Sequence, residues 1–239
     1  EKKNIISKKT CRLCKSLNLK SCFSFPKTPL ANEFVLKKKD QKIYPLDIVL
    51  CNSCYHLQLK HVVNPKVLFS NYVYVSGTSQ SFINHFKNYA FSIINKYKID
   101  KKELILEIGS NDGVLLNCFK NFGYKNIVGI EPAKSIAKSS NKRGLNTINS
   151  FFDKSTAKKI IKIYGKAKLI LANNVFAHID NLSDVFDNIN LILKDDGFVY
   201  FEVSYLLDVL KKNLFDTIYH EHISYHTVIP MINFLKSKN

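Results

Sequence analysis

The chain contains 239 residues, enough for one full domain and a small module. Hydrophobic residues make up 46% and charged residues 23% of it, and no apolar run approaches the roughly 20 residues that a membrane-spanning helix needs. No secretory signal pattern opens the chain, so we expect a cytoplasmic protein without a membrane partner. The formal net charge of +17 could indicate a nucleic-acid partner. Proteins that bind nucleic acids favour Arg for contacts to bases and phosphates, however, and only two of the 36 basic residues here are Arg. We therefore expect no nucleic-acid partner.

Two Cys-x-x-Cys pairs occur in residues 1–62, which we expect to form a small module. Cys11 and Cys14 make the first pair, and Cys51 and Cys54 make the second. Four thiolates about 2.3 Å from the metal form a closed tetrahedral zinc site. Disulfides are the alternative, but a cytoplasmic setting disfavours them. The pattern therefore predicts a structural Zn²⁺ with no open coordination position for catalysis.

Residues 63–100 differ in composition from the module before them. They contain a Tyr-rich stretch, Tyr72-Val-Tyr-Val-Ser-Gly77, followed by apolar residues at helical spacing from Phe82 to Tyr97. We expect a linker and then an amphipathic helix, which together cover the site formed by the residues that follow.

Short apolar strands alternate with helices in residues 101–239, and this pattern predicts an α/β domain. Parallel strands that are buried on both faces are continuous apolar runs, and helices cover both faces of their sheet. The expected fold class is therefore α/β, with a Rossmann-like sheet that follows a small N-terminal zinc module with four cysteine ligands. The expected strands are 104–108, 127–130, 145–148, 169–172 and 198–203, and the expected helices are 113–122, 135–142, 155–164 and 183–193.

A strand, a glycine-containing turn and the start of a helix succeed one another between Leu104 and Gly113. Gly109 allows a tight turn, but such a turn alone could bind several nucleotides. Glu107 would repel a pyrophosphate and can receive the cationic methionyl end of S-adenosylmethionine. Glu131, at the end of the next strand, can accept both ribose hydroxyls. The sequence therefore predicts that S-adenosylmethionine contacts Glu107, Gly109, Ser110, Asn111, Gly113, Glu131, Pro132, Asn173 and Asn174.

Four motifs occur in a specific order along the chain. They are the paired cysteines with Thr28-Pro-Leu-Ala-Asn32 between them, residues 72–77, residues 107–113 with 129–132, and residues 216–225. In these motifs the chain resembles the sugar C-methyltransferases of deoxysugar biosynthesis over nearly its whole length. The resemblance implies a class I S-adenosylmethionine-dependent methyltransferase sheet, incomplete at the C-terminus, and a further C-terminal α/β domain. We therefore expect the chain to be C-terminally truncated.

The resemblance also implies methylation of a carbon next to the ketone of a nucleotide-linked keto-deoxysugar. Such a reaction needs a base for the carbon-bound proton and a donor for the enolate oxygen. His222 is the expected base, because imidazole titrates near neutral pH and the resemblance points to this position. Glu221 would orient a histidine or a sugar hydroxyl, and His220 would stabilise the enolate. Tyr219 and Tyr74 would donate hydrogen bonds to substrate oxygens.

Two other interpretations remain open at this point. An O- or N-methyltransferase acting on another small metabolite would use the same cofactor and would also need a base. A catalytically inactive fragment that binds zinc and S-adenosylmethionine would carry the same cysteine pairs and the same turn. Taken alone, residues 219–222 also fit a His-rich surface loop.

Overall fold

The computed structural model describes residues 4–37, 40–69 and 72–238, and packing divides the chain into two compact units. The first unit comprises Glu1–Leu68, Asn174–Ser183 and Glu202–Asn239, and the second comprises Phe69–Asn173 and Asp184–Phe201. The sequence predicts three consecutive parts with boundaries at residues 62 and 100. The packing instead joins three segments that are separate in the sequence into the first unit. No helix in the described part of the chain has the length and apolar character needed to cross a membrane.

The second unit is built on a five-stranded sheet with the order β10-β9-β6-β7-β8. Strand β6 pairs in parallel with β7 and β9, and β7 pairs in parallel with β8. Every residue of β6 and β7 is buried, as expected for parallel strands covered on both faces. The strands are β6 (Ile105–Ile108), β7 (Ile127–Ile130), β8 (Thr147–Ile148), β9 (Ala167–Asn173) and β10 (Leu193–Glu202).

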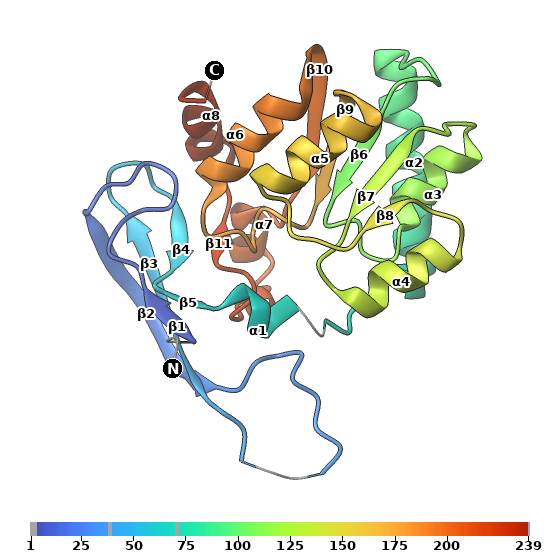
Figure 1. The fold of residues 1–239 in the computed structure, drawn as a ribbon. Helices are drawn as coiled ribbons and strands as arrows, with labels where there is room; N and C mark the ends of the chain where they lie inside the picture. Colours follow the sequence, from blue (N-terminus) through green and yellow to red (C-terminus); the bar gives the residue numbers. More distant parts are fainter. Residues whose placement is uncertain (1–3, 38–39, 70–71, 239) are drawn as a thin grey trace. The chain divides into compact units, whose positions relative to one another are not determined.

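Helices cover both faces of this sheet. Side chains of α2 and α3, including Phe86 and Leu116, form one core with Ile105 and Leu169 of the strands. Figure 1 shows α2 and α3 on one side of the sheet and α5 on the other. The predicted Rossmann-like α/β fold is therefore confirmed. The helices are α2 (Gln80–Tyr97), α3 (Val114–Asn121), α4 (Lys134–Lys142), α5 (Lys154–Tyr164) and α6 (Leu182–Ile192), with the short 3₁₀ turn η1 (Ser76–Thr78) before α2.

Two strands differ from the sequence prediction in their bounds. Strand β8 begins at Thr147, because Leu145 instead buries its side chain in the core beside α3. Strand β10 begins at Leu193, where the expected helix 183–193 ends, and runs through Asp195, Asp196 and Gly197 into the expected strand. The Lys168 ammonium lies 2.7 Å from the Asp196 carboxylate and also donates to its carbonyl oxygen. These contacts accommodate polar residues at the start of the strand.

The first unit contains two small antiparallel sheets. One pairs β1 (Ile5–Ser7) with β5 (His61–Val63), and the other has the order β11-β4-β3-β2. Its strand β11 pairs Ser224 with Gln58 of β4, so a C-terminal segment completes the sheet of the cysteine-bearing module. The remaining elements are β2 (Leu19–Thr28), β3 (Tyr44–Cys51), β4 (Leu57–Leu59), β11 (Ser224–Tyr225), α1 (Pro65–Phe69), α7 (Leu206–Lys211), η2 (Phe215–Thr217) and α8 (Val228–Lys236).

The turn before α3 gives a test of this packing. Gly113 has φ +81°, and a Cβ atom there would lie 2.4 Å from Leu145 Cδ1. We expect Gly113→Ala to lower the free energy of unfolding by about 3 kcal/mol, since it combines a left-handed backbone with a steric clash. Gly144→Ala is the control: its φ is +74°, but its nearest neighbour is the flexible Lys120 ammonium at 3.2 Å. Equal losses for the two variants in urea denaturation would contradict the packing.

Candidate functional site

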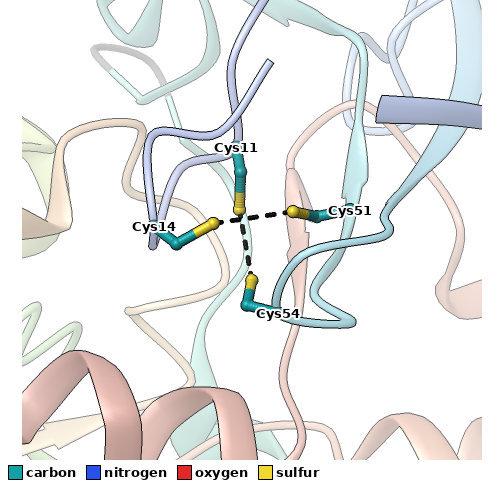
Figure 2. A group of neighbouring side chains, drawn as sticks. All are labelled: Cys11, Cys14, Cys51 and Cys54. Carbon is teal, nitrogen blue, oxygen red and sulfur yellow. Dashed lines mark hydrogen bonds between the residues drawn. The ribbon is translucent and has the colours of Figure 1, made fainter. Parts of the chain in front are cut away.

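The four predicted zinc ligands lie together in the first unit. Their Sγ atoms are all within 4.8 Å of one another, and Figure 2 shows them pointing toward a common centre. The distance is 3.6 Å from Cys11 to Cys54 and 3.5 Å from Cys14 to Cys51. A tetrahedral Zn²⁺ with bonds of about 2.3 Å separates its sulfur ligands by about 3.8 Å. The four cysteines therefore fit a closed, structural zinc site.

Both cysteine pairs adopt the same turn. Lys15 and Tyr55, which directly follow the two pairs, each have φ +62°. Their backbone N–H groups donate to the carbonyl oxygens of Cys11 and Cys51, at 3.1 and 2.7 Å. The hydrogen bond with Cys54 lowers the pKa of Cys11 to about 5 and raises the pKa of Cys54. The close approach of the two sulfurs favours the thiolate form of Cys11, the form in which a cysteine binds a metal.

In the second unit, the two predicted carboxylates are buried at the carboxyl ends of neighbouring strands. Glu107 is 4% exposed, and its Oε2 atom accepts no hydrogen bond from the described residues. Burial raises its pKa well above the usual value, and the negative charges of Asp112 and Glu131 raise it further. Glu131 is 5% exposed and is held by backbone N–H groups of Asn111 and Ala133, which donate to its two oxygens. Burial raises the pKa of Glu131 as well.

Other polar atoms of this unit are also buried and unpaired. Ser110 Oγ, Asp112 Oδ1 and Asn173 Nδ2 form no hydrogen bond with any described part of the chain. An unpaired buried polar group costs about 1–3 kcal/mol, so such groups are rare unless a ligand or water satisfies them. Donors and acceptors directly after β6 and at the end of β9 are thus available to a polar ligand.

Asn111 links the turn after β6 to the Tyr-rich stretch. It has φ +48°, and its Oδ1 atom accepts hydrogen bonds from the backbone N–H groups of Ser76 and Asp112. Its Nδ2 atom donates to the Tyr74 carbonyl at 3.0 Å. The Asn111 side chain therefore holds the Tyr-rich stretch against the turn, a role that glycine could not supply. The Tyr74 side chain is 47% exposed.

The remaining predicted cofactor residues fall in different places. Asn173 ends β9, and its Oδ1 atom accepts a hydrogen bond from the Tyr89 hydroxyl at 3.0 Å. Asn174 has φ +55° and belongs to the first unit, where its N–H donates to the Glu202 carbonyl. The Pro132 carbonyl accepts a hydrogen bond from the Asn149 side chain.

The hydrogen bonds of His222 define its tautomer. Its Nδ1 atom lies 2.9 Å from the Thr217 carbonyl, and its Nε2 atom lies 3.0 Å from the Tyr219 hydroxyl. Because a carbonyl oxygen only accepts, Nδ1 carries the proton and Nε2 accepts from Tyr219. Burial lowers the pKa of His222, so the ring is neutral near pH 7. The two hydrogen bonds therefore fix the orientation of the His222 ring and leave the lone pair on its Nε2 atom.

The two residues before His222 are engaged differently. The Oε1 atom of Glu221 accepts a hydrogen bond from Asn32 Nδ2 at 2.7 Å, which joins two of the sequence motifs. His220 is buried, and its Nε2 atom donates to the Tyr44 carbonyl at 3.3 Å. Burial lowers the pKa of His220 too.

His178 was not among the predicted site residues, yet its ring lies beside that of His222. The two ring centroids are 4.9 Å apart, and His178 Nδ1 donates to the Glu221 carbonyl at 2.8 Å. Burial, with His222 nearby, lowers the pKa of His178 to about 4. Its place shortly after the polar end of β9 was the available sequence signal, but that signal fits a packing histidine equally well.

Comparison with known proteins defines the family. Residues 82–232 match a family model described as "Methyltransferase domain", and residues 11–69 match one described as "Putative zinc binding domain". The chain is 35% identical over 221 residues to the C-methyltransferase NovU of Streptomyces niveus. That alignment covers 91% of this chain and 52% of NovU, so the chain spans about half the length of this curated relative.

Solved methyltransferases share the fold. The plantazolicin methyltransferase BpumL, in complex with S-adenosylhomocysteine, superposes with a TM-score of 0.51 at 15% identity, covering 65% of this chain and 62% of its own. Its counterpart BamL gives a TM-score of 0.51 at 16% identity, with coverages of 66% and 60%. The methyltransferase model matches more than half of the chain. The chain therefore belongs to the methyltransferase domain family and carries a zinc-binding module at its N-terminal side.

The metal site predicts a sharp difference between cysteine variants. We expect Cys51→Ser to abolish stoichiometric zinc and to lower the unfolding temperature, because three thiolates cannot close the tetrahedron. Cys22→Ser is the matched control, since Cys22 is exposed and lies outside the four-sulfur cluster. Metal analysis should find one zinc per chain in the wild type and in Cys22→Ser. Full zinc content in Cys51→Ser would contradict the assignment.

Proposed function

We propose that this chain carries the cofactor-binding and base-bearing parts of an S-adenosylmethionine-dependent C-methyltransferase. Its substrate is a nucleotide-linked keto-deoxysugar, methylated on a carbon next to the ketone. The name of NovU supports carbon as the acceptor, and the net charge of +17 favours a phosphate-bearing substrate. A tetrathiolate zinc site persists where thiols stay reduced, which supports a cytoplasmic location.

The His222–Tyr219 pair is the observation that carries this proposal. Oxygen and nitrogen acceptors already hold a nucleophilic lone pair, whereas a carbon acceptor must first lose a proton. A neutral imidazole with its Nδ1–H fixed on the Thr217 carbonyl is suited to remove that proton. Its partner Tyr219 holds a hydroxyl 3.0 Å from the basic nitrogen. Base and donor are thus adjacent, as enolate formation requires.

The reaction follows from these two side chains. Tyr219 turns its hydroxyl from His222 to the ketone oxygen of the substrate, which frees Nε2 and stabilises the enolate charge. The C–H bond next to the ketone breaks, and its proton goes to Nε2. When bound, S-adenosylmethionine would supply the methyl group to this carbon, and the electron pair of the broken sulfur–carbon bond would stay on the departing S-adenosylhomocysteine. Glu221 orients a sugar hydroxyl or a histidine, and the assignments of His220 to the enolate and of Tyr74 to a substrate oxygen stay predictions.

The cofactor site draws on the buried groups of the second unit. Glu131 keeps lone pairs on both oxygens for the two ribose hydroxyls, while backbone N–H groups hold the carboxylate in place. Glu107, whose Oε2 atom is unpaired, receives the cationic methionyl end. Ser110 Oγ and Asn173 Nδ2 supply further hydrogen bonds. The turn that contains Gly109 and Gly113, both with positive φ, lets the ligand approach the backbone closely.

Substitution of Glu131 tests the cofactor assignment. We expect Glu131→Gln to weaken S-adenosylmethionine binding about tenfold or more in calorimetric titration, since an amide cannot accept from both hydroxyls. Glu103→Gln is the control, because Glu103 instead pairs with Lys194. Unchanged affinity in a Glu131→Gln protein with wild-type unfolding temperature would contradict the assignment.

Substitution of His222 tests the proposed reaction. In D₂O the chain should exchange the proton next to the ketone of a keto-sugar nucleotide, and His222→Gln should slow that exchange about 100-fold or more. Because only the neutral ring acts as a base and burial lowers its pKa, the rate should fall on acidification only below about pH 6.5. NMR spectroscopy follows the exchange.

The control for this experiment is His61→Gln, the same change at a histidine that pairs with Asp47. Its exchange rate should equal that of the wild type. Methyl transfer by the wild type without any exchange would instead favour an oxygen or nitrogen acceptor. Wild-type exchange by His222→Gln would remove His222 from the base role.

A further inference from the structure

Each cysteine pair places one more buried side chain inside the first unit. Arg12 lies between Cys11 and Cys14, and its side chain is fully buried. The guanidinium donates through Nη1 to the Leu59 carbonyl at 2.8 Å and through Nε to Asp180 Oδ1 at 3.1 Å. A buried cation requires such partners, and an apolar side chain of similar size would fill the space at lower electrostatic cost. The choice of Arg here points to a geometric role.

The second pair contributes His56, which follows Cys54 by two positions. Its ring is completely buried and lies 5.3 Å, centroid to centroid, from the ring of His226. His226 in turn lies with its Nε2 atom 3.2 Å from the Phe176 carbonyl. Both cysteine pairs therefore contact the segments that contain or adjoin His178 and His222.

Those two segments are held together as one piece. The Ala177 carbonyl accepts hydrogen bonds from the backbone N–H groups of Ile223 and Ser224, at 2.9 and 3.1 Å. The His178 ring donates to the Glu221 carbonyl at 2.8 Å. Asp180 lies two residues beyond His178, so the Arg12–Asp180 ion pair fixes this piece to the first cysteine pair.

We propose that Arg12 is a positioning residue, which transmits the geometry of the zinc site through Asp180 to the His178–His222 pair. A zinc ion with four thiolates carries a net charge of −2, and Arg12 lies in the chain between two of those ligands, Cys11 and Cys14, while its guanidinium pairs with the Asp180 carboxylate. The consequence for catalysis rests on the proposed function. The contacts among Arg12, Asp180, His178 and His222 do not depend on that function.

The test compares Arg12→Met with Lys15→Met in the full zinc-loaded chain. Lys15 follows the same cysteine pair and donates to the Arg12 carbonyl, so its substitution removes the same charge without touching Asp180. We expect both variants to hold one zinc per chain. Of the two variants, only Arg12→Met should shift the ¹⁵N resonances of the His178 and His222 rings. These resonances are assigned by their loss from the spectra of His178→Gln and His222→Gln. Arg12→Met should also lower kcat for methyl transfer about tenfold or more, with the KM for S-adenosylmethionine unchanged.

Unchanged histidine resonances in a zinc-loaded Arg12→Met protein would overturn the proposal. If Arg12→Met does not fold, Asp180→Asn is measured in the same way, because it keeps the shape of the carboxylate. Lys8→Met is its control, since Lys8 also pairs with Asp180, at 2.6 Å. Failure of Asp180→Asn to shift the His178 resonance would likewise overturn the proposal. A third outcome separates the two proposals. If Arg12→Met shifts the histidine resonances but the wild-type chain neither exchanges nor methylates a keto-sugar, the positioning role holds and the proposed function is contradicted.

Discussion

Two carboxylates buried without a counter-ion are the constraint on which the second unit depends. Glu107 and Glu131 end neighbouring parallel strands, and neither forms an ion pair with the described residues. Backbone N–H groups compensate Glu131, but one oxygen of Glu107 has no partner. The raised pKa of each group records the cost of burying that charge. In the proposed cofactor site, a ligand with ribose hydroxyls and a cationic end would offset this cost.

The first unit also brings groups of like charge close together, in this case the four cysteine sulfurs. Four thiolates repel one another unless a cation lies between them, and the two cysteine turns present them at the spacing that zinc requires. Strand β11 adds a C-terminal segment to the module's sheet, so the sequence between Tyr219 and Tyr225 folds against the cysteine-bearing part of the chain. In the proposed arrangement, Arg12 connects the metal site through Asp180 to the segment of His178, while His56 packs beside the ring of His226. A structural metal thus acquires a role in the proposed chemistry.

The sequence predicted those features that local pattern encodes. The cysteine spacing indicated the metal site, and buried apolar runs indicated the parallel strands, including the acids at the ends of β6 and β7. Contacts between distant residues carry no such signal: Arg12 meets Asp180 across 168 positions, and Asn32 meets Glu221 across 189. The contact of His178 with His222 depends on the same long-range pairing. The roles of the predicted site residues stay proposals, because they depend on ligands.

Carbon as the methyl acceptor is the central claim, and carbon–carbon coupling tests it most directly. The chain is incubated with methyl-¹³C-labelled S-adenosylmethionine and a ¹³C-labelled keto-sugar nucleotide, and the product is examined by mass and NMR spectroscopy. The account predicts a product heavier by one methylene unit whose new methyl carbon shows one-bond coupling to a ring carbon. A new methyl group without that coupling, attached to oxygen or nitrogen, would contradict it.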